Sequence, residues 1–180
     1  AQGMTFSGVE KIGAYGDNSQ LTGSQNSETF VLTGNNRLTV SGMDVSGVGS
    51  VVGQSNDRVQ DGGDLHYELH SQTGAQVANL YLQGLALTNI QWDSGDSIAL
   101  AADHTLTGKS IDSKGAWIIG SEHSDTFVLT GVNAVEYSDV AFTNVTQVDA
   151  LAGQDSVVGA ADWVLQANQS ARANGVTFHN

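Results

Sequence analysis

The feature that most constrains this chain is an internal repeat. The thirty residues that begin at Gly23, GSQNSETFVLTGNNRLTVSGMDVSGVGSVV, align without a gap to the thirty that begin at Gly120, GSEHSDTFVLTGVNAVEYSDVAFTNVTQVD. The two copies lie 97 residues apart, and 13 of their positions are identical. Self-similarity at a fixed spacing is typical of repeat architectures, in which each unit buries its apolar face against its neighbours. We therefore expect a stack of related units.

A shorter word suggests a finer unit. It consists of an apolar residue, Ser or Thr, Gly or Asn, and then Val or Ile. It begins at Phe6, Val45, Leu87 and Phe142. The spacings of 39, 42 and 55 residues predict about four degenerate repeats of roughly forty residues, one of them expanded between Leu100 and Gly120. Insertions in repeat proteins map to loops on one face, so this one is where we expect any partner to bind.

The apolar runs are short, rich in Val, Leu, Ile, Phe and Thr, and bounded by Gly, Asn, Asp and Ser, which predicts strands and turns. We expect strands at 29–33, 38–41, 65–69, 77–82, 116–119, 126–130, 135–137 and 163–165. The segment 163–173 has some helical character, but its counterpart 65–69 alternates strictly, so we interpret it as strand. The fold prediction is all-β: a right-handed parallel β-helix, or solenoid, over 1–180, forming one segment of a longer repetitive protein. Two tandem β-sandwich domains, each of roughly ninety residues, are the alternative.

The two long copies place the same kinds of apolar residue at the same steps, which predicts the core. The expected core residues are Phe30, Leu32, Val48, Val51, Phe127, Leu129, Val145 and Val148.

Three aspartates precede an apolar step, as in GQDSVV and SGDSIA. They are Asp57, Asp96 and Asp155. These steps resemble the core of calcium-binding nonapeptide repeats, but calcium needs six to eight oxygens, which tandem nonapeptides supply by stacking. Here the steps are tens of residues apart, so we interpret the carboxylates as turn caps that bind backbone amides. Calcium binding is the alternative, and no cofactor is required.

The segment Asp64-Leu65-His66-Tyr67-Glu68-Leu69-His70 alternates strictly, so as a strand it turns its polar residues to one face and its apolar residues to the core. Imidazole and carboxylate groups on one face suit a divalent metal. The simpler interpretation, which we adopt, is the polar face of a surface strand.

No motif assembles an acid, a base and a nucleophile, so we predict that the chain is not an enzyme and assign no catalytic, cofactor-binding or metal-binding residue. The alternative is a polysaccharide-binding or polysaccharide-degrading β-helix. Its groove would use Lys109, Asp112 and Lys114, or its binding face would use exposed aromatic residues such as Trp92 and Trp117.

The net charge and the lengths of the apolar runs limit the kinds of partner that we expect. With 19 acidic and 6 basic residues the net charge is −13, so we expect no nucleic-acid partner, because phosphate backbones need clustered Lys and Arg. No apolar run reaches the ~18 residues of a membrane span, so no membrane insertion is expected. The absence of Cys excludes disulfides and thiolate metal sites.

Phrases such as SETFVLTGNNRLTVSGMDVSGV, SDTFVLTGVNAVEYSDVAFTNVTQVDALAGQDSVVGAADWVL and LAADHTLTGKSID resemble the degenerate repeats of giant bacterial adhesins of the filamentous haemagglutinin type. The resemblance runs from Phe6 to Phe178. It implies a secreted or cell-surface bacterial protein, a parallel β-helix, and a stalk or adhesin segment. The partners it implies are neighbouring repeats of the same chain, and host or environmental glycans or proteins.

Overall fold

The protein is an all-β solenoid of about five turns, seen in a computed structural model that describes residues 11–14, 19–54, 56–159 and 161–179. The predicted fold class is confirmed. The described residues contain no α-helix, only one turn of 3-10 helix, η1 (Leu87–Asn89). None of them forms a helix long and apolar enough to cross a membrane. The copy of the short word at Phe6 lies outside the described residues.

The strands are short, as the Gly- and Asn-bounded runs predict. In the first part of the chain they are β1 (Lys11–Gly13), β2 (Gln20–Thr22), β3 (Thr29–Gly34), β4 (Arg37–Val40), β5 (Met43–Ser46), β6 (Ser50–Val52), β7 (Arg58–Asp61), β8 (His66–Ser71), β9 (Gly74–Val77), β10 (Leu80–Gln83) and β11 (Ile90–Gln91). They continue as β12 (Ser97–Leu100), β13 (Ser110–Asp112), β14 (Trp117–Ile119), β15 (Thr126–Gly131), β16 (Ala134–Tyr137), β17 (Val140–Thr143), β18 (Gln147–Asp149), β19 (Ser156–Val158), β20 (Val164–Leu165), β21 (Ala171–Ala173) and β22 (Val176–His179).

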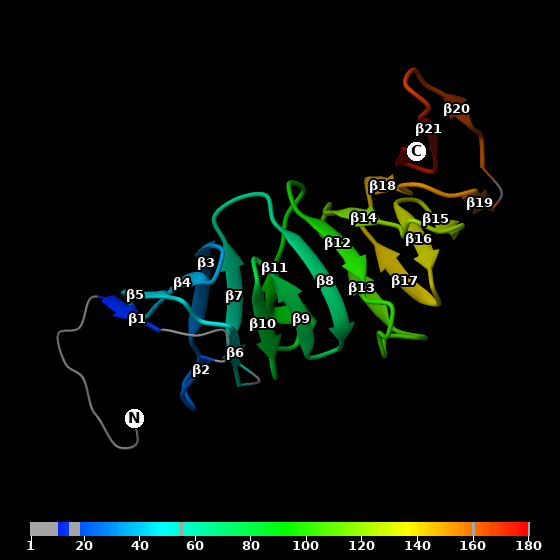
Figure 1. Cartoon of the computed structure of the whole chain (residues 1–180). Helices are drawn as coiled ribbons and strands as arrows, with labels where there is room; N and C mark the ends of the chain where they lie inside the picture. Colours follow the sequence, from blue (N-terminus) through cyan, green and yellow to red (C-terminus); the bar gives the residue numbers. More distant parts are fainter. Residues whose placement is uncertain (1–10, 15–18, 55, 160, 180) are drawn as a thin grey trace.

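These strands form two walls, which the chain visits alternately as it advances along the elongated body (Figure 1). The continuous wall is one sheet of eleven strands, in the order β2-β6-β10-β9-β8-β12-β14-β18-β22-β21-β20. The split wall consists of two sheets, β1-β5-β4-β3-β7-β11 and β13-β17-β16-β15-β19. Buried side chains from both walls form one hydrophobic core. The walls differ at one place: β12 pairs with β14 in the continuous wall, whereas β11 and β13 end separate sheets.

The repeating unit is a three-stranded antiparallel meander, which the sequence did not predict. Four copies are present: β3-β4-β5, β8-β9-β10, β15-β16-β17 and the shorter β20-β21-β22. The outer strands of the first three meanders pair in parallel with strands of the neighbouring turns, as β3 does with β7 and β5 with β1. In the fourth, β22 pairs in parallel with β18, and β20 is the last strand of its wall in the described residues. The parallel stacking predicted for a β-helix is therefore present, with one reversed strand inserted in each meander.

The prediction of one continuous strand over 77–82 is wrong. It divides into β9 and β10, because Ala78 and Asn79 have φ values of 48° and 61° and form a two-residue turn. Positive φ at both central positions is the geometry of the tight hairpin turns that match the twist of paired strands. The equivalent turns in the other meanders are Ser41-Gly42, Ser138-Asp139 and Asn174-Gly175.

The short word marks a corner after the last strand of a meander, but one of its copies was misplaced. The corner positions Gly47, Gly84 and Asn144 have φ values of 74°, 70° and 57°. The second meander therefore reaches its corner in Leu82-Gln83-Gly84-Leu85, and the copy assigned to Leu87 falls in η1 instead. From Val45 to Leu82 the unit spans 37 residues.

All eight predicted core residues are buried, none of them more than 7% exposed. Phe127 is fully buried, with its ring centroid 4.7 Å from that of Tyr137 and 6.3 Å from that of Phe178. The strong repeat thus located the core correctly, because equivalent steps of a stacked unit face the same interior.

Candidate functional site

Asp57 and Asp96 are turn caps, as the sequence analysis proposed, and they also join successive turns of the solenoid. Asp57 is fully buried and accepts hydrogen bonds from the backbone N–H groups of Gln54 at 2.7 Å and Glu28 at 2.9 Å. Asp96, also fully buried, accepts in the same way from Asp93 at 2.7 Å and Leu65 at 2.9 Å. One N–H donor lies three residues before the aspartate and the other about thirty residues before it, so each carboxylate caps its own turn and also binds the preceding turn.

Asp155 forms only half of this arrangement. Its Oδ1 accepts the backbone N–H of Asp125 at 2.9 Å, but its Oδ2 is buried without a hydrogen-bond partner among the described residues. Asp125 in turn accepts the backbone N–H of Ser121 at 2.6 Å. The cap of the second long copy is therefore weaker than that of the first.

A second set of cross-turn bonds uses asparagine and was missed by the sequence analysis. The side-chain amide of Asn36 donates to the carbonyl oxygens of Val48 at 2.8 Å and Asn79 at 2.9 Å. Asn133, 97 residues later, donates to Val145 at 2.8 Å and to Gly175 at 3.3 Å. The signal was present, since Asn is identical at this step of both long copies.

The alternating segment forms β8 with the predicted facing: Tyr67 and Leu69 are fully buried and His66 is exposed. His66 Nδ1 lies 2.9 Å from Ser97 Oγ, and His70 Nδ1 lies 3.6 Å from a carboxylate oxygen of Asp103. The two histidines thus have separate partners on the next turn. No group of three or more potential metal ligands occurs within the described residues.

Carboxylates gather at the corner beside β8. The Tyr67 hydroxyl donates to Asp61 at 2.6 Å, and burial together with this bond raises the pKa of Tyr67 well above its usual range. Burial also raises the pKa of Asp96 to about 6, with Asp61 and Asp93 adding to the effect. Because burial disfavours the charged form of a carboxyl group, ionisation of Asp96 lowers the stability of the folded chain.

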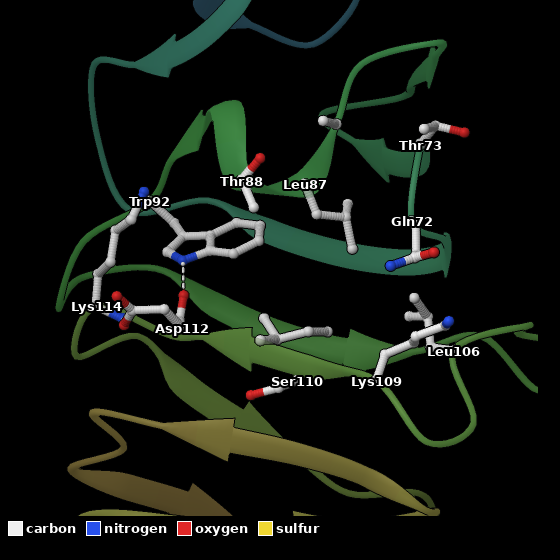
Figure 2. A pocket seen from close by; sticks show the side chains of 12 residues that line it. Gln72, Thr73, Leu87, Thr88, Trp92, Leu106, Lys109, Ser110, Asp112 and Lys114 are labelled. Carbon is white, nitrogen blue, oxygen red and sulfur yellow. Dashed lines mark hydrogen bonds between the residues drawn. The ribbon is translucent and has the colours of Figure 1, made fainter. Parts of the chain in front are cut away.

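A cleft of about 450 Å³ opens where the split wall is interrupted, between η1 and β11 on one side and β13 on the other (Figure 2). The insertion between Leu100 and Gly120 supplies half of its lining, including Lys109, Asp112 and Lys114. The three residues that the polysaccharide-degrading alternative named therefore line one cleft. The cleft also lies in the insertion that the sequence analysis named as the place for a partner.

Two hydrogen bonds brace one end of this cleft. The Trp92 indole N–H donates to the carbonyl oxygen of Asp112 at 2.8 Å, drawn as a dashed line in Figure 2. The Lys114 ammonium donates to the carbonyl oxygen of Ile90 at 2.8 Å and lies 5.7 Å from the centroid of the Trp92 ring. The Asp112 carboxylate accepts from the Asn144 amide, which lowers the pKa of Asp112. Side chains thus replace the strand pairing that is missing between β11 and β13.

The expectation that Trp92 is an exposed aromatic is wrong. It is 3% exposed and packs its ring edge against Tyr67, with 5.9 Å between the ring centroids. Trp117 is half-buried and stacks on His179, at 5.4 Å and an interplanar angle of 12°. Of the seven exposed large apolar residues in the described part of the chain, four gather instead at the end formed by β19 and β20. They are Val158, Trp163, Val164 and Leu165, at 50%, 40%, 59% and 85% exposure, and the other three are Tyr81, Val132 and Leu151.

Comparisons with protein-family models, with curated proteins and with solved structures find no match to this chain.

Proposed function

We propose that this chain is a structural segment of a bacterial extracellular or cell-surface protein, a stalk or adhesin repeat whose ends stack on neighbouring repeats. The observation that carries the proposal is the open end of both walls. In the described residues β19 is the last strand of the split wall and β20 the last strand of the continuous wall. Their counterparts in the turn that follows the first long copy, β7 and β8, are covered in parallel by β11 and β12.

The side chains at this end fit such a contact. Val158, Val164 and Leu165 are exposed on these two strands, and apolar side chains beside unpaired strand edges favour the addition of further strands. The net charge of −13 limits unwanted association of other surfaces. The resemblance to filamentous haemagglutinin-type adhesins supports the bacterial and extracellular part of the proposal. Glycans or proteins at that surface are the proposed external partners.

The test appends the missing turn. In the first copy, residues 85–100 follow β10 and form β11 and β12, so a copy of this segment placed after Asn180 is designed to cover β19 and β20. We expect a higher melting temperature and weaker acrylamide quenching of Trp163 fluorescence. Phe replaces Trp92, Trp117 and the copy of Trp92 in the appended segment, so that Trp163 is the remaining Trp signal. The control carries Asp at the appended positions equivalent to Ile90 and Ile98, which are buried in the original. Equal melting temperatures with the appended segment and its control would refute stacking.

The cleft lined by Lys109, Asp112 and Lys114 favours ligand binding as a second function, and it is the reason to test the polysaccharide-degrading alternative. The prediction that the chain is not an enzyme is checked by incubation with acidic and neutral polysaccharides and assay for new reducing ends or unsaturated products. We expect none. Turnover that Lys109→Gln abolishes would replace the structural proposal with an enzymatic one.

A further inference from the structure

The cleft in the split wall has a lining that selects a particular chemistry, and this inference does not depend on the stacking of the ends. Its volume of about 450 Å³ is within the range of small-molecule sites. The lining is predominantly apolar, with Leu87, Leu106 and Ile111 contributed from both sides of the gap. A sugar needs hydrogen-bond partners around its ring, so this lining suits a ligand with a hydrocarbon body better than a polysaccharide.

The cleft contains two positively charged side chains, whereas the molecule as a whole is strongly negative. Lys109 and Lys114 are two of only six basic residues in a chain of net charge −13. Lys114 is engaged with Ile90, as described above. The Lys109 ammonium, by contrast, forms no hydrogen bond or ion pair with the described residues, although it is exposed in a strongly acidic protein. It is the cation available to a ligand.

The two ends of the cleft differ, which gives a ligand a direction. Lys109 and Gln72 lie at one end, and Trp92, Asp112 and Lys114 lie at the other, with Leu87 between them (Figure 2). Asp112 would repel an anion at its own end, so a carboxylate is driven towards Lys109. The exposed side chain of Gln72 forms no hydrogen bond with the described residues and provides an additional donor there.

We propose that the cleft binds a small organic carboxylate with an apolar body. The carboxylate pairs with the Lys109 ammonium, and the hydrocarbon part lies along Leu87 and Ile111 towards Trp92. Charge-assisted hydrogen bonds are the strongest available to such a head group, and burial of the hydrocarbon supplies the rest of the affinity.

The experiment uses octanoate, with octanol and octylamine as probes of the same chain length that differ in charge. Binding is followed by the indole N–H resonance of Trp92 in two-dimensional NMR, assigned with Trp92→Phe. We expect octanoate to shift this resonance in a saturable manner, with octanol weaker and octylamine weakest. Lys109→Gln should weaken octanoate binding by roughly tenfold or more. The matched control is Lys11→Gln, which makes the same charge change on β1, away from the cleft.

A second variant tests the cavity rather than the charge. Ser110 is exposed at the cleft, so Ser110→Trp fills the space without disturbing the core and should abolish binding of all three probes. Several results would overturn the proposal: no saturable shift with octanoate, equal binding of the three probes, or equal effects of Lys109→Gln and Lys11→Gln. Shifts at Trp163 instead of Trp92 would place the binding at the exposed end of the solenoid and would also overturn it.

Discussion

The most informative perturbation is removal of the Asp57 carboxylate, because the chain contains its own matched control. Asp57→Ala leaves two partly buried backbone N–H groups, those of Glu28 and Gln54, without their acceptor. Asp155→Ala leaves one, that of Asp125, because the second oxygen of Asp155 has no partner among the described residues. The cross-turn donor is an acidic residue in both caps, Glu28 in one and Asp125 in the other.

The loss in free energy of unfolding depends on how many backbone N–H groups lose their acceptor. A buried polar group that loses its partner costs about 1–3 kcal/mol. We therefore expect Asp57→Ala to lower the free energy of unfolding by about 2–6 kcal/mol and Asp155→Ala by about 1–3 kcal/mol. Asp57→Asn keeps one carbonyl acceptor and should lie between the wild type and Asp57→Ala.

The assay is equilibrium urea unfolding at neutral pH, followed by far-UV circular dichroism and by tryptophan fluorescence. Solenoids are stabilised mainly by contacts between neighbouring turns, so coincident transitions and equal slopes against urea are required before free energies are compared. If Asp155→Ala is as destabilising as Asp57→Ala, the counting of capped N–H groups is refuted. If neither exceeds about 0.5 kcal/mol, the caps do not hold the turns together.

Three further predictions follow from the core, the charges and the corner beside β8. Phe127→Ala should cost about 3–5 kcal/mol, as should Phe30→Ala at the equivalent step, and a loss under about 1 kcal/mol in the same urea assay would contradict the burial of the ring. Millimolar calcium and magnesium should raise the melting temperature by similar small amounts, also in Asp57→Asn, whereas a calcium-specific rise of about ten degrees lost in that variant would reveal a calcium site. Burial raises the pKa of Asp96 from 3.8 to about 6, so the stability it contributes is complete below pH 3.8 and is lost as the pH rises through 6. Urea unfolding between pH 4 and 7 should therefore show a decline in stability that Asp96→Asn reduces, and an unchanged decline would exclude Asp96 as its source.

The sequence was sufficient for the fold class, the core and two of the three caps, because each of these depends on what a repeat places at the same step. Phe30 and Phe127 are 97 residues apart and both are buried. Asp57 and Asp96 precede apolar steps and cap their turns. Stacking of similar units makes such local signals reliable, since every unit has nearly the same neighbours.

The reversal of β9 could not be read in the same way. Strand alternation has the same period in either direction along the chain, so apolar periodicity does not distinguish a parallel turn from a hairpin. Turn chemistry normally marks the hairpin, but at Ala78-Asn79 one of the two central residues is Ala, which seldom adopts positive φ. The run from Val77 to Leu82 consequently looked like one strand.

Trp92 was misjudged for a different reason, which also explains the cleft. Its burial depends on β13, which arrives about twenty residues later and turns away from β11 to pair with β17. The continuous wall closes at this level by pairing β12 with β14, so the two long copies remain joined on one side while the other side stays apart. An aromatic ring and a long cationic side chain then occupy part of the space that a strand would fill, and they satisfy the carbonyl oxygens of Asp112 and Ile90 on the two facing edges. Those bonds account for one end of the gap only, and the end beside Lys109 is left open with an apolar floor. A site of this kind arises from a mismatch between the two walls of a repeat protein, and no single repeat carries its signature.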